Sequence, residues 1–381
     1  MREVVILGST GSIGRQALEI IDAHPEKFRV LAISSAGTNP DLVIAQAKAF
    51  KPAFVGVVAN AEVIRDALPG VKVIDGALAA TEIATLECGV VLNGITGSIG
   101  LGPTLAALDA GNTLALANKE SLVAGGQLVM SKARPHQIIP VDSEHSAIWQ
   151  CAMAGKADEI RKLVLTASGG PFVDRADLSQ VSVAEALKHP TWNMGAVVTI
   201  NSATLVNKAL EIIEAHYLFA MPYNAIDAVI HRQSVVHSMV EFHDGSTIAQ
   251  ASPPNMKGAI AYALNFPHRL DKAVEPINWS RSHQWSFEPI DPARFPAIAL
   301  ARKCGEAGGG VPAIFNAANE IAVAAFIAGR IRFSSILRVV EAVLQTYEVS
   351  APTVPRDLAD VSAIEDDAKS HAHEYISRLA T

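Results

Sequence analysis

The stretch VVILGSTGSIGRQALEIIDAH (residues 4–24) joins a β-branched run to a glycine-rich turn and then to apolar residues spaced at helical intervals. This order predicts a strand, a tight turn and an amphipathic helix. Gly8, Gly11 and Gly14 lie in the turn, where glycines let backbone amides at a helix N-terminus approach a pyrophosphate. The spacing GxxGxxG differs from the usual GxGxxG, so a glycine-rich turn that binds nothing is the alternative interpretation.

The alternation of short β-branched runs and helical segments continues to about residue 143. Six more predicted strands follow the first: VLAIS (30–34), AFVGVV (53–58), VKVI (71–74), GVVLN (89–93), TLALAN (113–118) and QIIPVD (137–142). Helical segments such as DLVIAQAKAF (41–50) separate them, and such a chain forms a parallel sheet with helices on both faces. We therefore predict an α/β fold in which residues 1–143 form a doubly wound, Rossmann-like, nucleotide-binding domain.

The rest of the chain follows other patterns. Three β-branched runs after residue 143 predict strands: KLVLTAS (162–168), AVVTIN (196–201) and DAVIH (227–231). A helix candidate at about residues 204–219 lies between the second and the third. Asp244-Gly245 between two alternating runs predicts a hairpin, so residues 144–265 are expected to form a mixed α+β catalytic domain. Residues 266–295 are rich in proline and predict an irregular linker. Residues 296–381 hold four helix candidates and predict a helical bundle.

Composition and charge narrow the class of protein. The chain has 381 residues, half of them hydrophobic and 18% charged, which predicts two or three folded domains. A net charge of −7 gives no general attraction for nucleic acid or an anionic membrane. The uncharged run 89–108 is interrupted by glycines and Pro103, which argues against a membrane span. The first strand begins so near Met1 that we expect no cleavable leader, and the separated Cys88, Cys151 and Cys304 fit a reducing cytoplasm.

The end of the second predicted strand bears on the choice of nucleotide. NAD-dependent enzymes usually place a carboxylate there to accept a hydrogen bond from the ribose 2′-hydroxyl. This chain has AISSAGTNPD (32–41), in which Gly37, Thr38 and Asn39 offer amide, hydroxyl and carboxamide donors. The pattern favours NADP. An ordinary turn in which Asn39 and Asp41 start a helix is the alternative.

Carboxylates with the spacing of metal ligands occur in two places. Asp142 and Glu144 in VDSEHSA (141–147) follow the last predicted strand, and a two-residue spacing puts both on one face. An alternative is a helix start with Ser143 as its cap. On the predicted helix near residue 210, Asn207, Lys208 and Glu211 share one polar arc. A solvated face with a Lys208–Glu211 pair is the alternative there.

The irregular stretch 168–195 has the composition of a lid over a substrate. Ser168 and the two glycines after it offer hydroxyl and amide donors to a phosphate, and Trp192 would exclude water. Buried packing would also explain Trp192, and His189 and His237 taken singly fit structural roles. Farther back, Asn118, Lys119 and Glu120 in LANKES lie at the carboxyl edge of the predicted sheet, although a solvated lysine is the commoner case.

Eight motifs taken together resemble one family, the 1-deoxy-D-xylulose 5-phosphate reductoisomerases. They span the chain: GSTGSIG (8–14), ALANKES (115–121), VDSEHSA (141–147), TASGGPF (166–172), HPTWNMG (189–195), NSATLVNKALE (201–211), SVVHSMV (234–240) and FNAANEIAVAAF (315–326). The resemblance implies NADPH-dependent conversion of 1-deoxy-D-xylulose 5-phosphate to 2-C-methyl-D-erythritol 4-phosphate, in the non-mevalonate isoprenoid route, by a homodimer. Retroaldol cleavage with re-addition and a concerted shift both remain open for the rearrangement.

The resemblance also implies residue roles. Divalent metal (Mg²⁺, Mn²⁺ or Co²⁺) would be held by Asp142, Glu144 and Glu211, and the substrate phosphate by Ser168, Ser202, Asn207 and Lys208. The rest of the substrate would meet Ser143, Lys119, Glu144, His189, Trp192 and His237, of which Lys119, Glu144, His189 and His237 would be catalytic. NADPH would meet Gly8, Thr10, Gly11, Ser12, Ile13, Gly37, Asn39, Asn118, Glu120 and Gly195.

Two positions depart from the family's pattern. Thr38 stands where a Lys or Arg is usual, which weakens the expected preference for NADP over NAD. Arg232 in IHRQS (230–234) stands where Pro is usual, which leaves the local backbone in doubt. Two other functions stay open: a reductase of another phosphorylated hydroxyketone, and a non-catalytic protein that senses NADP.

Overall fold

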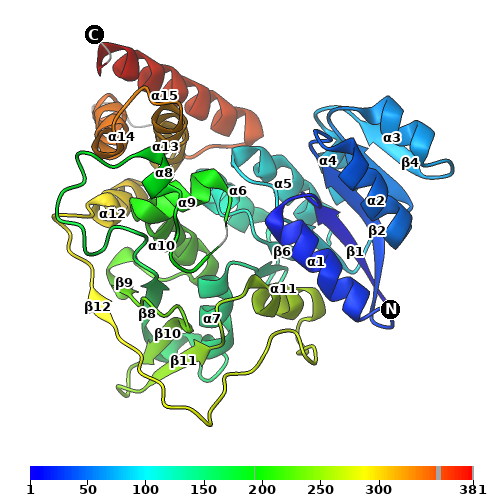
Figure 1. Cartoon of the computed structure of the whole chain (residues 1–381), viewed down its shortest axis with the longest axis horizontal. Helices are drawn as coiled ribbons and strands as arrows, with labels where there is room; N and C mark the ends of the chain where they lie inside the picture. Colours follow the sequence, from blue (N-terminus) through cyan, green and yellow to red (C-terminus); the bar gives the residue numbers. More distant parts are fainter. Residues whose placement is uncertain (193, 349–352, 380–381) are drawn as a thin grey trace. The chain divides into compact units, whose positions relative to one another are not determined.

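The computed structural model describes residues 1–192, 194–348 and 353–379, shown as a ribbon in Figure 1. Asn193 of the HPTWNMG motif lies outside the described residues. The chain divides into two compact units that each combine separate stretches: unit 1 is Met1–Ser121, Ser131–Ser146 and Asn255–Pro276, and unit 2 is Leu122–Met130, Ala147–Pro254 and Ile277–Thr381. The domain boundaries expected near residues 143, 265 and 295 stay predictions.

Unit 1 is built on a seven-stranded sheet in the order β4-β3-β2-β1-β5-β6-β7. All its strand pairs are parallel, and the strands are β1 (Arg2–Leu7), β2 (Phe28–Ser35), β3 (Phe54–Val57), β4 (Lys72–Asp75), β5 (Val90–Asn93), β6 (Leu114–Leu116) and β7 (Ile138–Pro140). Each of the seven predicted strands is therefore confirmed. The central strands β1 and β5 are fully buried over Val4–Leu7 and Val90–Asn93, as expected for a parallel sheet that is covered on both faces.

Helices connect these strands in chain order. Those that lie within unit 1 are α1 (Ser12–Ala23), α2 (Pro40–Phe50), α3 (Ala61–Ala67), α4 (Ala79–Ala84), the short η1 (Ser98–Gly100) and α5 (Leu101–Asp109). Most of α6 (Glu120–Lys132), which follows β6, and of α7 (Ser143–Ala152), which follows β7, belongs to unit 2. A further helix, α11 (Met256–Asn265), also belongs to unit 1 and packs against α1, β6 and β7 (Figure 1). Lys257 of α11 pairs with Glu19 of α1 at 2.6 Å. The sequence pattern did not indicate this helix, because its partners lie more than a hundred residues earlier.

The glycines of the β1–α1 turn are required by close backbone contacts. A Cβ on Gly14 would lie 2.4 Å from the Gly8 carbonyl oxygen and 2.5 Å from Ser9 Cα. Gly8 itself has φ +80°, and a Cβ there would lie 2.8 Å from the carbonyl oxygen of Gly94. Gly94 directly follows β5, so the turn after β1 packs against the loop after β5. These two strands flank the point where the strand order reverses, which is where such sheets bind ligands.

Unit 2 contains a mixed sheet of five strands in the order β11-β10-β8-β9-β12. Only β8 and β9 among these neighbours pair in parallel, and the strands are β8 (Ile160–Ala167), β9 (Ile226–Ile230), β10 (Val236–Phe242), β11 (Thr247–Ala251) and the two-residue β12 (Glu288–Pro289). The hairpin predicted at Asp244-Gly245 is confirmed, since β10 and β11 are antiparallel on either side of it.

The β-branched run AVVTIN is helical rather than extended. It forms most of α9 (Ala196–Ala203), which meets the predicted helix α10 (Val206–Phe219) at a bend of 94°. Thr199 donates its side-chain hydroxyl to the Gly195 carbonyl at 2.9 Å, and Thr199 and Ile200 are buried. Burial within unit 2 therefore outweighs the strand propensity of this run. Three short elements complete this part: η2 (Ala157–Glu159), α8 (Val183–Ala186) and η3 (Tyr223–Ala225).

The four helices predicted for the C-terminal region are confirmed. They are α12 (Ala297–Ala307), α13 (Val311–Ile327), α14 (Ile336–Gln345) and α15 (Leu358–Leu379), with the short η4 (Phe333–Ser335) before α14. Phe315, Phe326 and Phe333 belong to the buried core that these helices share with α10. Across the part of the chain that the structure describes, no single helix is long and apolar enough to cross a membrane; the bent pair α9 and α10 passes by length and composition only when taken together.

We expect Gly14→Ala to destabilise unit 1, because the added methyl group would overlap backbone atoms that cannot move aside as a flexible side chain can. The free energy of unfolding should fall by about 2–3 kcal/mol. Chemical denaturation followed by circular dichroism measures it. Gly258→Ala, in the helix α11, is the matched control. Its added Cβ would lie 3.4 Å from Val274, an ordinary contact distance, so this variant should be as stable as the wild type or slightly more stable. Equal stability of both variants would contradict the close-packing argument.

Candidate functional site

In unit 1, the N-terminus of α1 lies at the carboxyl ends of the central strands. Its cap residue is Gly11, and within the described residues no side chain caps its first amides. Gly11 and Ser12 are exposed and Thr10 is partly exposed. Uncapped backbone amides at a helix N-terminus attract an anionic group. The geometry therefore suits the pyrophosphate of a dinucleotide.

At the end of β2, the residues predicted to meet the ribose lie on the surface. Thr38 and Asn39 are exposed, and Gly37 is buried under Ala59. Asn39 also caps α2, because its side-chain oxygen accepts a hydrogen bond from the Leu42 amide at 3.1 Å. The helix-start interpretation of Asn39 is thus confirmed, while Thr38 remains available to a ligand on the surface.

Asn118 is buried and joins two loops at the carboxyl edge of the sheet. Its side-chain amide donates to the carbonyls of Ile95 and Gly97 at 2.8 and 2.9 Å, and its oxygen accepts from the Ser121 amide at 3.0 Å. The same amide donates to Glu120 at 2.9 Å. Asn118 therefore holds the loop after β5 against the start of α6, a role that the sequence alone did not indicate.

Lys119 and Asp142 form a mostly buried ion pair. The ammonium nitrogen of Lys119 lies 2.7 Å from a carboxylate oxygen of Asp142, and their side chains are 12% and 14% exposed. Glu144 lies in the first turn of α7, and one of its carboxylate oxygens lies within 4.8 Å of one of Asp142. Ser143 donates its hydroxyl to Glu144. Two carboxylates this close are the oxygen donors that a hard divalent cation prefers.

In unit 2, the sharp bend before α10 brings three polar side chains together. Leu205, at the bend, has φ +59°. Asn207 and Lys208 both donate hydrogen bonds to the carboxylate of Glu211. Lys208 is only 3% exposed and Glu211 only 1%, so the interpretation as a solvated face is wrong. Burying a charged pair costs desolvation free energy, which is repaid only when the hydrogen-bond geometry is good. The buried Lys208–Glu211 pair therefore makes the start of α10 a candidate functional site.

Ser168 and His189 lie within hydrogen-bond distance, with the Ser168 hydroxyl oxygen 2.9 Å from His189 Nε2. His189 Nδ1 accepts from the amides of Thr191 and Trp192 at 3.1 and 2.8 Å, so Nε2 carries the proton that Ser168 accepts. Burial lowers the pKa of His189 to about 4. The ring is therefore neutral at pH 7 and donates from a fixed direction.

Two more of the predicted substrate residues lie on neighbouring elements of unit 2. The rings of Trp192 and His237 are 6.3 Å apart, and His237 Nε2 is 3.0 Å from the Ser252 hydroxyl. Ser202 lies near the end of α9, and a Cβ on Gly170 would come within 2.7 Å of its carbonyl oxygen. The loop that begins at Ser168 thus packs directly on the end of α9.

Three polar contacts were missed by sequence reasoning. Gln46 of α2 exchanges hydrogen bonds with Ser9 of the glycine-rich turn at 2.8 and 2.9 Å, and both are buried. Asn319 of α13 donates to Asn201 of α9 at 3.0 Å. Arg232 pairs with carboxylates from two other segments. A polar residue inside an apolar helix is the available signal for Gln46 and Asn319, but their partners are not visible from the sequence.

Comparison with known proteins gives matches along the whole chain. The family model described as 1-deoxy-D-xylulose 5-phosphate reductoisomerase matches residues 4–126. The model for the C-terminal domain of 1-deoxy-D-xylulose 5-phosphate reductoisomerase matches residues 138–219, and the model described as DXP reductoisomerase C-terminal domain matches residues 251–371. The three models follow one another in order, and residues 127–137 and 220–250 lie between them.

Individual relatives agree with the family models. The 1-deoxy-D-xylulose 5-phosphate reductoisomerase of Leifsonia xyli is 53% identical, with 99% of each chain covered, and that of Paenarthrobacter aurescens is 51% identical, with 100% of this chain and 98% of the relative covered. A solved structure of the Zymomonas mobilis enzyme in complex with NADPH matches with a TM-score of 0.91 at 39% identity over 98% of this chain and 99% of that one. A DOX-P reductoisomerase structure in complex with NADPH, fosmidomycin and magnesium matches with a TM-score of 0.93 at 37% identity over 100% of this chain and 99% of that one. The chain belongs to the 1-deoxy-D-xylulose 5-phosphate reductoisomerase family.

Proposed function

We propose that this protein converts 1-deoxy-D-xylulose 5-phosphate to 2-C-methyl-D-erythritol 4-phosphate, using NADPH and a divalent cation, in the non-mevalonate route to isoprenoids. The observation that carries this proposal is the end-to-end match to one family, with 51% and 53% sequence identity to two of its enzymes. The sheet with its glycine-rich turn suits the nucleotide, and the carboxylates suit the cation. When bound, the cation would act as a Lewis acid on the substrate carbonyl, and NADPH would supply hydride.

The proposed cation ligands are Asp142, Glu144 and Glu211. All three offer carboxylate oxygens, which Mg²⁺ and Mn²⁺ prefer. Lys119 pairs with Asp142 and Lys208 pairs with Glu211, so each of these two carboxylates has a cationic partner in mostly buried surroundings.

The proposed phosphate ligands are Ser168, Ser202, Asn207 and Lys208, all in unit 2. Lys208 is buried, and a phosphate would give its ammonium group a second anionic partner besides Glu211. Ser168 lies at the end of β8, and its loop packs against α9 where Ser202 lies. Hydroxyl, carboxamide and ammonium donors on short, packed segments suit the terminal phosphate of a sugar.

Five residues are proposed to surround the reacting part of the substrate, namely Ser143, Lys119, His189, Trp192 and His237. Of these, Lys119, His189 and His237, together with Glu144, are the proposed catalytic residues. His189 is neutral and donates from Nε2, so it would orient Ser168 or a substrate oxygen without adding charge. Trp192 would exclude water from the reacting carbons. The segment 168–195 is proposed to act as a lid.

The proposed NADPH contacts come from the glycine-rich turn, the end of β2, the start of α6 and the start of α9. They are Gly8, Thr10, Gly11, Ser12, Ile13, Gly37, Asn39, Asn118, Glu120 and Gly195. Two other proposals are that the protein is a homodimer, which rests on the family alone, and that it works in the cytoplasm, which rests on its three separated cysteines. Sedimentation velocity would report the oligomeric state directly.

We expect the purified protein to oxidise NADPH in the presence of 1-deoxy-D-xylulose 5-phosphate only when Mg²⁺, Mn²⁺ or Co²⁺ is present. Absorbance at the nicotinamide band follows the reaction, and chelator followed by added metal gives the matched control. A panel of other phosphorylated hydroxyketones distinguishes this substrate from that of a related reductase. Turnover without metal, or no turnover with any of the three metals, would contradict the proposal.

We expect Glu211→Gln to abolish turnover while NADPH still binds, because Glu211 is proposed to hold the cation rather than the nucleotide. Nucleotide binding by fluorescence and Mn²⁺ binding by electron paramagnetic resonance separate the two effects. Since the neutral side chain leaves the buried Lys208 without its full counter-charge, Glu211→Asp serves as a second variant that keeps the charge. Loss of NADPH binding in a folded variant that retains Mn²⁺ would contradict the assignment.

We expect Thr38→Arg to lower the Michaelis constant for NADPH relative to that for NADH. Thr38 is exposed beside the end of β2, and a guanidinium there would bind a 2′-phosphate in bidentate fashion. Steady-state kinetics with both nucleotides give the ratio, and Thr38→Glu should shift it in the opposite direction. A ratio that neither variant changes would mean that Thr38 does not face the ribose.

A further inference from the structure

The turn His231–Ser234 lies beside the strand that leads to the proposed phosphate site. The His231 amide donates to the Ala167 carbonyl at 2.7 Å, and Ala167 directly precedes Ser168. The Ser234 amide donates to the His231 carbonyl at 3.0 Å, which places Arg232 at the first central position of the turn. Proline, the usual residue of the family here, favours this same position of a β-turn. The side chain of Arg232 therefore takes no part in the backbone hydrogen bond that closes the turn.

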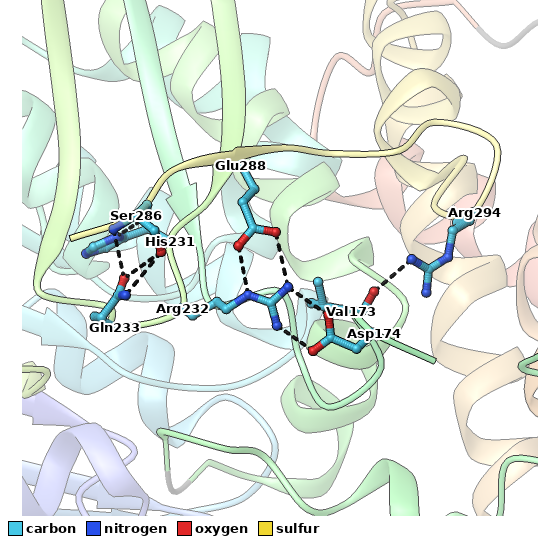
Figure 2. Close-up of polar contacts among 8 residues, drawn as sticks. All are labelled: Val173, Asp174, His231, Arg232, Gln233, Ser286, Glu288 and Arg294. Atoms are coloured by element: carbon cyan, nitrogen blue, oxygen red, sulfur yellow. Dashed lines mark hydrogen bonds and ion pairs between the residues drawn. The ribbon is translucent and has the colours of Figure 1, made fainter. Parts of the chain in front are cut away.

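Arg232 binds two carboxylates at once (Figure 2). Its Nε and Nη2 donate to the two oxygens of Glu288 at 3.0 and 3.1 Å. Its Nη1 and Nη2 donate to the two oxygens of Asp174 at 2.6 and 2.9 Å. Each pair has the fork geometry that suits arginine and that lysine or glutamine cannot reproduce. We call these three residues, Asp174, Arg232 and Glu288, the Arg232 clamp.

The clamp joins three segments of unit 2. Asp174 lies six residues after Ser168 on the same loop. Glu288 lies in β12, directly opposite Ile230 of β9. Arg294 fastens the same loop from another side by donating to the Val173 carbonyl at 2.7 Å (Figure 2). It also donates to the Phe172 carbonyl at 3.1 Å. We call the loop that begins at Ser168 the Ser168 loop. Two arginines, Arg232 and Arg294, thus hold it at residues 172–174.

The turn itself does not depend on the Arg232 side chain. His231 is buried, donates from Nδ1 to the Ser286 carbonyl at 2.8 Å, and accepts at Nε2 from the Val236 amide at 3.1 Å. Gln233 donates to the Ser286 hydroxyl at 3.1 Å. Removing the guanidinium should therefore loosen the loop at Asp174, while Arg294 still holds Phe172 and Val173 and the turn and β12 stay in place.

The charges of the clamp make its strength depend on salt concentration. Arg232 lowers the pKa of Asp174 and of Glu288 by hydrogen bonding, and the charge of Asp174 acts in the opposite direction on Glu288. Two carboxylates without the guanidinium would repel one another. The side chains of Asp174, Arg232 and Glu288 are 81%, 36% and 43% exposed, so salt screens the pairs and their strength is modest.

We infer that Arg232 is a positioning residue that strengthens substrate binding by clamping the Ser168 loop to β12 through Asp174 and Glu288. The inference rests on the proposed function, in which Ser168 holds the substrate phosphate. Because the clamp acts on binding rather than on the reacting atoms, it sets the Michaelis constant for the phosphosugar and leaves kcat and NADPH binding nearly unchanged. It also makes substrate binding depend on ionic strength.

The decisive variant is Arg232→Gln. We expect the Michaelis constant for 1-deoxy-D-xylulose 5-phosphate to rise about three- to tenfold, with kcat and the Michaelis constant for NADPH within about twofold. Adding Asp174→Asn to this variant removes the repulsion between the carboxylates and should recover part of the loss. Arg356→Gln is the matched control, because it removes another bidentate pair, with Asp360, from the C-terminal region. It should leave all three constants unchanged.

Two measurements separate a clamp from a merely stabilising ion pair. Raising the salt concentration from about 0.05 to 0.5 M should raise the substrate Michaelis constant more in the wild type than in Arg232→Gln, because only the wild type has a clamp to screen. Hydrogen exchange of amides 168–175 should be faster in Arg232→Gln than in the wild type or Arg356→Gln. Equal salt profiles, equal exchange, or a fall in kcat with an unchanged Michaelis constant would each overturn the inference. The exchange comparison needs no turnover, so it tests the clamp even if the proposed substrate proves wrong.

Discussion

The structure of unit 1 depends on one steric constraint: the turn after β1 must pass against the loop after β5 with backbone touching backbone. A side chain at Gly8 or Gly14 would overlap carbonyl or Cα atoms. This contact leaves the N-terminus of α1 uncapped at the carboxyl edge of the sheet, where its amides face outward. Asn118 and Gln46 then fix the surrounding loops through buried hydrogen bonds. A nucleotide site follows from this packing with few side chains of its own.

In unit 2 the corresponding constraint is electrostatic. Lys208 and Glu211 are almost fully buried at the start of α10, and neither charge would be tolerated there alone. The bend between α9 and α10 places them, and the contact of Asn201 with Asn319 ties α9 to the C-terminal helices. The C-terminal helices therefore support the position of the proposed phosphate ligands as well as the core, although they supply none of those ligands.

The Arg232 clamp differs from these constraints, because its side chains are exposed to solvent and salt therefore weakens its ion pairs. Arg232 links the Ser168 loop to β12 through Asp174 and Glu288. Since salt screens this exposed contact far more than the buried Lys208–Glu211 pair, the clamp and the proposed phosphate ligands on α10 respond differently to ionic strength.

The sequence by itself determined the local order of unit 1, because the seven parallel strands are short, apolar and separated by glycine-rich or helical segments. It also determined the hairpin at Asp244-Gly245, the four C-terminal helices and the family, whose motifs are long and specific. Only the tertiary structure decided that AVVTIN is helical and that Met256–Asn265 packs against α1, β6 and β7. It also decided that Lys208 and Glu211 are buried and that Arg232 meets Asp174 and Glu288. The physical reason is the same in each case: burial and pairing depend on residues far apart in the chain, and a local pattern carries no record of those partners.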